Sequence, residues 1–119
     1  MNVLNPNDDR IFPGLETISG EYILCAAVWF NDSIKHEEQP KNIEIGFVVC
    51  GRRHGDCILT VIYLNKQIVD DLHESNNKAV MGFLTSYNRF VNRKEAGNIA
   101  FRSGQIKKKT DCLFSEDLY

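Results

Sequence analysis

The sequence predicts an α+β fold, a single compact domain in which an antiparallel β-sheet carries one or two helices. The length of 119 residues suits one domain, and 43% hydrophobic with 25% charged side chains is an ordinary globular composition. Four short stretches have strand-like patterns, and one later stretch has the cap and periodicity of a helix. No internal repeat or linker divides the chain, so residues 1–119 are expected to form one domain.

The strand-like stretches differ in their apolar patterns. Glu21–Phe30 is a nearly continuous apolar run, as in a buried strand. Lys41–Cys50 alternates apolar and polar residues, as in a half-buried strand. Cys57–Asn65 is rich in β-branched residues, and Ala79–Ser86 is a further apolar run. Each stretch is therefore predicted to be a strand.

The six residues GRRHGD, at positions 51–56, separate the second and third of these stretches. Their length and the glycines near both ends suit a connection between antiparallel strands. Residues 41–65 are therefore predicted to form a hairpin with Arg52, Arg53 and His54 at its tip. Residues 1–20 suggest an irregular lead-in, and residues 66–77 fit either a short helix or a turn.

The best helix signal begins at Asn92, a favourable N-cap residue that is followed three positions later by Glu95. An apolar stripe at helical spacing follows, and Gly104 is a natural terminator. Gly97 weakens the interior slightly. The pattern predicts a helix over residues 92–103.

Positive charge is crowded around the start of this predicted helix. Arg93 and Lys94 follow the cap directly, and Asn88, Arg89 and Phe90 precede it. A helix N-terminus already carries partial positive charge, so cations there are unfavourable unless an anion is bound. The pattern fits a phosphate site, or cations that simply extend into solvent.

The charge distribution limits the class of partner. Residues 1–88 hold 7 Lys and Arg against 12 Asp and Glu, whereas residues 89–119 hold 7 against 4. An acidic body, in a chain whose overall net charge is −2, does not suggest a DNA-binding protein, and no DNA partner is expected. The asymmetry fits a local anion pocket or an uneven solvated surface.

Two further features favour the pocket. The guanidinium groups of Arg52 and Arg53 match phosphate geometry, although a charged hairpin tip is an ordinary feature. Phe83, Tyr87 and Phe90 interleave with the cations, a combination that stacks a base beside a diphosphate. Aromatic residues at such positions are also common in a hydrophobic core.

The sequence lacks recognisable catalytic and metal-binding motifs. The sequence has no nucleophile elbow, zinc-protease motif, P-loop or dinucleotide fingerprint, so no catalytic residue, cofactor or metal is assigned. His54 lies near Cys57, but without an orienting third residue. The four cysteines have no C-x-x-C spacing and are expected to be reduced, with Cys25 and Cys50 buried in strands. Neither a spanning segment nor a signal peptide is recognisable, which predicts a cytosolic protein.

Three stretches together resemble a known family. "GRRHGDCI", "GFLTSYNRFVNRKEA" and the terminal "LFSEDLY" are similar to the phage Thoeris anti-defence sponges. Members of that family sequester glycocyclic ADP-ribose, a signal made by TIR enzymes, and so silence the Thoeris effector. The resemblance implies binding without cleavage in the cytoplasm of a bacterial host. It also implies a homodimer that can assemble further into a hexamer, with pockets between protomers, and some members hold other cyclic oligonucleotides.

The resemblance also implies roles for individual residues. Arg52 or Arg53 would contact the diphosphate, Phe83 would stack on adenine, and Phe114 would close the pocket. Asn88, Arg89 and Asn92 would hold phosphate or ribose. The complete set of residues expected to bind ligand is Arg52, Arg53, His54, Phe83, Asn88, Arg89, Phe90, Asn92, Arg93 and Phe114.

Two other functions remain open from the sequence. One is a small hydrolase of a nucleotide signal that uses Glu116, Asp117 or His54. The other is a protein-interaction module that blocks an immune enzyme through exposed aromatic residues. The apolar tail at residues 112–119 is expected to pack at a dimer interface, and Lys107–Lys109 are expected to be a solvated run.

Overall fold

A computed structural model describes residues 20–64 and 79–119 of the chain. The predicted lead-in up to residue 19 and the ambiguous stretch at residues 66–77 lie outside the described residues. The elements in chain order are β1 (Ile23–Phe30), β2 (Phe47–Gly51), α1 (His54–Leu64), β3 (Ala79–Thr85), β4 (Phe90–Asn92), α3 (Arg93–Arg102) and α4 (Ser115–Leu118).

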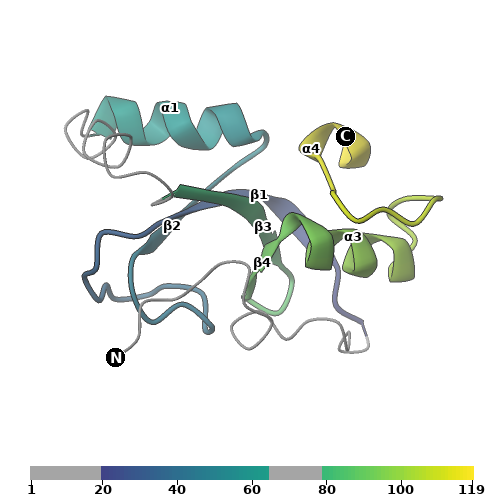
Figure 1. Cartoon of the computed structure of the whole chain (residues 1–119), viewed down its shortest axis with the longest axis horizontal. Helices are drawn as coiled ribbons and strands as arrows, with labels where there is room; N and C mark the ends of the chain where they lie inside the picture. The colour runs from purple at the N-terminus through teal and green to yellow at the C-terminus, as the bar shows by residue number, and fades with distance from the viewer. Residues whose placement is uncertain (1–19, 65–78) are drawn as a thin grey trace.

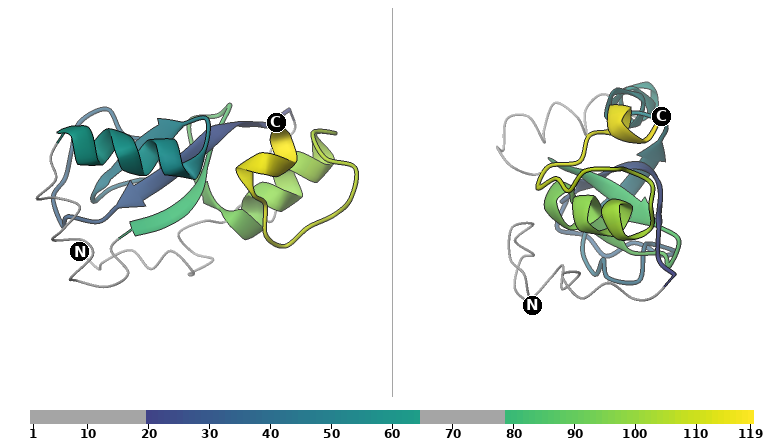
Figure 2. Two further views of the ribbon diagram at one scale, coloured as in Figure 1. Left: turned by 90° about the horizontal axis from the view of Figure 1, so that it is seen from above. Right: turned by 90° about the vertical axis from the view of Figure 1, so that its right-hand side faces the viewer.

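The four strands form one sheet in the order β2-β1-β3-β4, and every neighbouring pair is antiparallel. The helix α1 lies across one face of this sheet, and α4 lies above α3 on the same side (Figures 1 and 2). The predicted α+β class, an antiparallel sheet with few helices, is confirmed.

The central strand β1 has a continuous apolar sequence because both of its faces are covered from Ala26 to Phe30. Ala26, Val28 and Phe30 belong to a core cluster shared with Phe83 and the helices α1 and α3. Ala27 and Trp29 point to the opposite face, into a second cluster with Ile43 and Phe90. A strand buried on both faces cannot show the alternation of a half-exposed one.

The predicted strand at residues 57–65 is wrong, because this segment is the helix α1. Its buried residues His54, Cys57 and Val61 recur at the spacing of one helical face. The N–H of Arg53 bonds to the carboxylate of Asp56 at 3.2 Å, and the carbonyl of Arg53 accepts from the N–H of Asp56 at 3.0 Å. This reciprocal capping starts a helix where a hairpin was predicted.

The predicted hairpin over residues 41–65 is therefore wrong as well, and GRRHGD is a strand-to-helix junction. The second strand is also shorter than predicted, because it begins only at Phe47. Gly46 has a φ of 81°, and a Cβ there would lie 2.4 Å from the carbonyl oxygen of Phe30. This close approach and left-handed backbone separate Ile43, which packs in the second core cluster, from the strand.

The predicted helix over residues 92–103 is confirmed as α3 with its two caps. The Asn92 side chain accepts a hydrogen bond from the N–H of Glu95 at 2.9 Å, and Ser103 is the C-cap. Close packing explains the glycine at position 97 inside the helix, because a Cβ there would lie 2.3 Å from the carbonyl oxygen of Thr110. The chain after α3 therefore folds back closely over the helix.

The C-terminal segment packs on its own chain. Leu113 is fully buried in the main core cluster, and its N–H bonds to the carbonyl of Arg93 at 3.1 Å. Ser115 is also buried, and the N–H of Phe114 bonds to the carboxylate of Asp117 at 2.9 Å. Part of the apolar tail is thus accounted for without a partner chain, whereas the dimer itself stays a prediction.

Candidate functional site

Three segments that are far apart in sequence meet at one end of α1. They are the β2–α1 junction with Arg52 and Arg53, the start of α3 with Arg93, and the C-terminal segment with Phe114 and Tyr119. We call these five residues the arginine–aromatic cluster. The structure therefore brings together four residues predicted from the sequence, Arg52, Arg53, Arg93 and Phe114, and adds Tyr119.

Arg53 joins the junction to the C-terminal segment. Its guanidinium lies 5.3 Å from the ring centre of Tyr119, and its Nη2 donates to the main-chain oxygen of that residue. Its Nη1 is buried without a hydrogen bond among the described residues, and the Glu116 carboxylate lies 3.8 Å away. The guanidinium of Arg52 also faces the Tyr119 ring, at 5.8 Å. An anion with well-placed oxygens can satisfy Nη1 better than this long ion pair does.

Arg93 joins α3 to the same C-terminal segment. Its guanidinium lies 4.6 Å from the ring centre of Phe114, in cation–π geometry. Its Nη1 donates to the carbonyl of Leu113 at 2.7 Å, and its Nη2 contacts the sulfur of Met81 at 3.4 Å. Arg93 has no carboxylate partner among the described ion pairs. Within residues 20–64 and 79–119, its positive charge is held in place without a neutralising carboxylate.

His54 lies beneath the cluster and is only 7% exposed. Its Nε2 is 2.8 Å from the carbonyl oxygen of Gly82, and its Nδ1 is 3.4 Å from Nη2 of Arg93. Burial, followed by the neighbouring Arg93 charge, lowers the pKa of His54 despite the opposing effects of Gly82 and Glu116. The ring is therefore neutral at pH 7 and both of its nitrogens are occupied.

Phe83 and Phe90 are core residues, both fully buried. The ring of Phe83 packs edge-on against His54 with centroids 5.0 Å apart, whereas Phe90 lies in the second core cluster. Stacking of Phe83 on an adenine would require the core to open. The observed position is that of a support for His54, because β3 passes directly under the start of α1.

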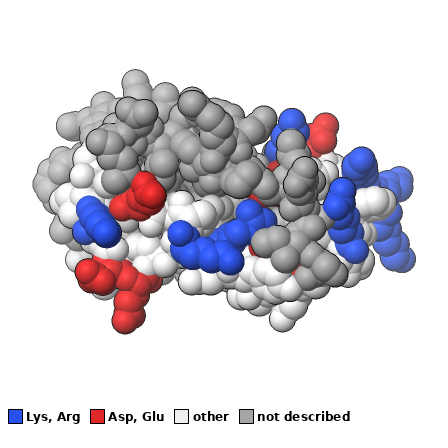
Figure 3. Space-filling model, turned by 90° about the horizontal axis from the view of Figure 1, so that it is seen from below, with Lys and Arg blue, Asp and Glu red and all other residues white. Residues whose placement is uncertain are grey.

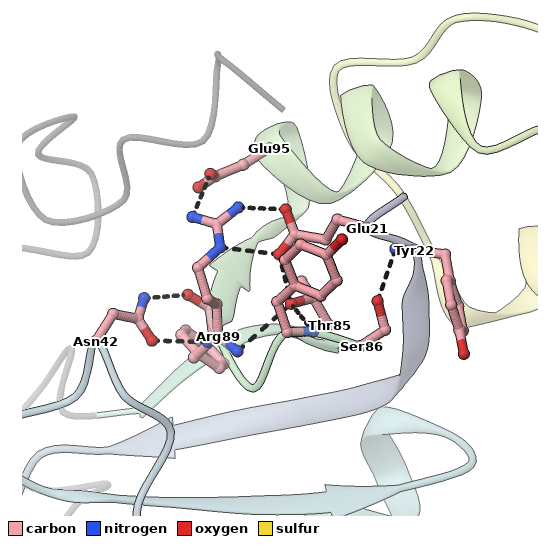
Figure 4. A network of polar contacts seen from close by, with 9 residues as sticks. Glu21, Tyr22, Asn42, Thr85, Ser86, Arg89 and Glu95 are labelled. Atoms are coloured by element: carbon pink, nitrogen blue, oxygen red, sulfur yellow. Dashed lines mark hydrogen bonds and ion pairs between the residues drawn. The ribbon is translucent and has the colours of Figure 1, made fainter. Parts of the chain in front are cut away.

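Arg89 belongs to a separate, closed network (Figure 4). Its Nε and Nη2 donate to the two carboxylate oxygens of Glu21, both at 2.8 Å, and its Nη1 bonds to Glu95 at 3.3 Å. Thr85 donates to Glu21 at 2.6 Å. Arg89 is 7% exposed and Glu21 is 4% exposed. The cation that precedes α3 is thus neutralised by carboxylates rather than left for a phosphate.

Burial and Arg89 have opposite effects on the pKa of Glu21. Burial alone would raise the pKa of Glu21, but hydrogen bonds from Arg89 and Thr85 and the Arg89 charge lower it overall. The hydrogen bond with Glu21 likewise raises the pKa of Arg89 above its usual value. Glu21 and Arg89 are therefore both held in their charged forms.

The two predicted asparagines have local structural roles. Asn88 is exposed in the β3–β4 turn with a φ of 58°, a conformation that asparagine tolerates well. Asn92 is the N-cap of α3. Asn42, which the sequence did not single out, pairs with both main-chain groups of Phe90, at 2.6 and 2.8 Å.

The charged side chains are unevenly spread over the surface seen from below (Figure 3). Lys and Arg gather at the end formed by α3 and the turn after it, most of the acidic side chains in this view lie toward the other end, and further basic side chains lie between them and beside them. Gln105–Thr110 and Asp117 line an open hollow of about 520 Å³ at the basic end. Lys107–Lys109 are exposed, as expected. None of the residues predicted to bind ligand lines this hollow.

The cysteines differ from expectation in their burial. All four are unpaired, but Cys50 is exposed and Cys25 is half-buried, whereas Cys57 is the buried one. The thiol of Cys50 lowers the pKa of Cys25 to about 7, and burial raises the pKa of Cys57 to about 11. In the described part of the chain, no three His, Cys, Asp or Glu residues are grouped as metal ligands.

Two residues that the structure places in these contacts were not singled out from the sequence. Tyr119 contributes a ring and a main-chain oxygen to the cluster, and Glu21 holds Arg89 across 68 positions. Tyr119 lies within a stretch quoted for the resemblance, whereas Glu21 reads only as the polar start of an apolar run. Neither partner can be assigned without the fold.

The fold and the cluster define a small α+β protein with a half-exposed group of arginines under aromatic rings. The family model described as "Phage T4 y16D protein" matches residues 22–119, which include every element described above. The chain belongs to this phage protein family. Comparisons with curated proteins and with solved structures gave no match. In the described residues, no helix has the length and apolarity required to cross a membrane.

Proposed function

We propose that this phage protein is an anti-defence sponge that binds glycocyclic ADP-ribose, or a related cyclic nucleotide, without cleaving it. One observation carries the proposal. Arg52, Arg53 and Arg93 converge from two segments beside the rings of Phe114 and Tyr119. Guanidinium groups form charge-assisted hydrogen bonds with phosphate oxygens, and aromatic rings stack on bases.

The state of the arginines supports an anionic ligand. Arg93 is held by a carbonyl oxygen and a ring, which fix its position but leave its charge uncompensated. Arg53 has a buried Nη1 without a hydrogen-bond partner among the described residues. A diphosphate would supply oxygens to Arg93 directly, and to Nη1 of Arg53 after a shift of this partly exposed side chain. The ligand set of the proposal is therefore Arg52, Arg53, Arg93, Phe114 and Tyr119, with Phe83, Phe90 and Arg89 acting as support.

The contacts of the candidate acid–base residues favour binding over hydrolysis. Both ring nitrogens of His54 are engaged, and the carboxylate of Asp117 bonds to the N–H of Phe114. Glu116 is 71% exposed and lies 3.8 Å from the Arg53 guanidinium, whose positive charge favours the ionised carboxylate over a proton-accepting role. A general base needs a free lone pair within reach of its proton. We therefore propose a non-catalytic protein that acts in the cytoplasm of the bacterial host.

A second candidate function is a protein-binding inhibitor, which exposed apolar residues on α1 favour. Leu59, Tyr63 and Leu64 are 49%, 84% and 79% exposed. The same surface suits a second copy of the chain, and a homodimer or hexamer is part of the proposal. Light scattering on the full chain and on a Tyr63→Ser/Leu64→Ser variant tests this, since loss of a dimer is expected only in the variant.

The sponge is tested by depletion and recovery of the ligand. Purified protein is mixed with glycocyclic ADP-ribose, the free ligand is removed by filtration, and the retained fraction is heated and analysed by chromatography. The proposal predicts that ligand is depleted and then recovered intact. Recovery of fragments would indicate a hydrolase, and no depletion would favour the protein-binding function.

A further inference from the structure

The ring of His54 occupies a fixed place between β3 and α3. Its Nε2 lies 2.8 Å from the carbonyl oxygen of Gly82, which can only accept, so Nε2 carries the proton. In a neutral ring the other nitrogen, Nδ1, is then an acceptor. Nδ1 faces Nη2 of Arg93 at 3.4 Å, and a guanidinium can only donate. One tautomer satisfies both contacts.

We infer that His54 is a positioning residue for Arg93, which it holds beneath Phe114 without itself touching the ligand. The inference rests on the proposed function for its effect on binding. His54 is 7% exposed and its ring packs edge-on against Phe83, so it cannot rotate freely toward a ligand. The carbonyl of Leu113 holds Nη1 of Arg93 from the other side. Histidine and carbonyl together fix the plane of the guanidinium.

This arrangement depends on the protonation of His54. A protonated ring carries N–H groups on both nitrogens, so Nδ1 would present a proton and a positive charge to Arg93. The charged groups that face the ring are Arg93 from α3 and Glu116 from α4, while β3 presents the Gly82 carbonyl and the Phe83 ring. Binding should therefore be constant at neutral pH and should decline on acidification, as the pH falls through the lowered pKa of His54.

Two variants separate positioning from simple packing. His54→Gln retains one donor for Gly82 and one acceptor for Arg93, whereas His54→Phe retains a ring against Phe83 but neither polar contact. His54→Phe should weaken binding of glycocyclic ADP-ribose by about tenfold, the value of one hydrogen bond to a charged group. His54→Gln should bind within about threefold of the wild type and lose the acid decline, because it has no titrating ring. Melting temperatures identify any variant that fails to fold.

Nitrogen NMR of the empty protein tests the inference independently of the ligand. We expect the His54 ring to be the neutral Nε2–H tautomer at pH 7, and the Arg93 side-chain N–H signals to broaden or shift in His54→Phe but not in His54→Gln. A wild type that does not bind at any pH, with these signals as expected, would contradict the proposed function alone. Unchanged Arg93 signals in His54→Phe, or a flat pH profile with wild-type affinity in that variant, would overturn the role of His54.

Discussion

The chain builds two arginine clusters around the start of α3: a closed cluster of Arg89 with Glu21 and Glu95, and an open cluster, which is the arginine–aromatic cluster that contains Arg93. They differ in how the positive charge is compensated. Arg89 is 7% exposed and meets two carboxylates, Glu21 and Glu95. Arg93, four residues later, meets a carbonyl, a histidine nitrogen and an aromatic ring. The first arrangement leaves no charge to recruit a ligand. The second leaves a positioned cation, so two arginines four residues apart in one basic stretch differ in whether a described carboxylate compensates their charge.

The largest expected effect of breaking the closed cluster is on stability. Arg89→Ala should cost about 3–5 kcal/mol of unfolding free energy, because it leaves buried carboxylates without a partner. Arg53→Ala should cost less, about 1–2 kcal/mol, since it loses one hydrogen bond to the main-chain oxygen of Tyr119 and an ion pair with Glu116 that is long and partly exposed. Urea unfolding of both variants measures the difference. Equal losses would show that the clusters do not differ as described.

Replacing the core residue Phe83 should likewise cost more stability than replacing Phe114 in the open cluster. Phe83→Ala removes a fully buried ring and should cost about 3–5 kcal/mol. Phe114 is 48% exposed, so Phe114→Ala should leave the melting temperature nearly unchanged and should instead weaken ligand binding by roughly tenfold or more. Thermal melts and ligand titrations of the same samples check both. A stable Phe83→Ala protein with impaired binding would contradict this and would indicate that Phe83 contacts the ligand directly.

Acid should weaken the closed cluster through Glu21. Because its pKa is lowered in the folded protein, Glu21 contributes stability that is fully present above its unfolded pKa and is lost as the pH falls through the folded pKa. Glu21→Gln cannot titrate, so its stability should fall less steeply between about pH 5 and about pH 3. Denaturant unfolding across this range compares the two. Parallel curves for wild type and variant would argue against the role of Glu21.

The smallest expected effect concerns Glu116 in the open cluster. Its carboxylate lies 3.8 Å from Nη1 of Arg53 and is 71% exposed, so it competes with a ligand for that group without holding it strongly. Glu116→Gln should tighten binding by up to about fivefold, the range of an exposed ion pair. Asp111→Asn, the same charge change at an exposed position, is the matched control. Equal gains in both would indicate a general charge effect.

The sequence predicted those features that depend on local signals. The Asn92 cap, the helix it begins and the central apolar strand β1 follow from short-range patterns, and all were found. The helix α1 was missed because its β-branched residues outweighed the helical spacing of Cys57 and Val61 and the capping carboxylate of Asp56. Those two signals were present and would have favoured a helix.

The division between the two clusters could not be predicted. Arginines at positions 89 and 93 have similar neighbours in the sequence, and only the fold places Glu21 against one and Phe114 against the other. These partners are 68 and 21 positions away from their arginines. Long-range pairing of this kind depends on how β1, α3 and the C-terminal segment pack. Neither the composition nor the residue spacing of the sequence predicts these partners.

The central claim is that the open cluster, rather than basic charge in general, holds the ligand. Calorimetric titration of glycocyclic ADP-ribose into wild type, Arg53→Ala/Arg93→Ala and the exposed-lysine control Lys94→Ala/Lys107→Ala tests it directly, since both double variants remove two positive charges. The account predicts a loss of at least about a hundredfold for the arginine variant, which removes two charge-assisted contacts, and less than about threefold for the lysine variant. Wild-type affinity in the arginine variant, or an equal loss in the lysine variant, would contradict it.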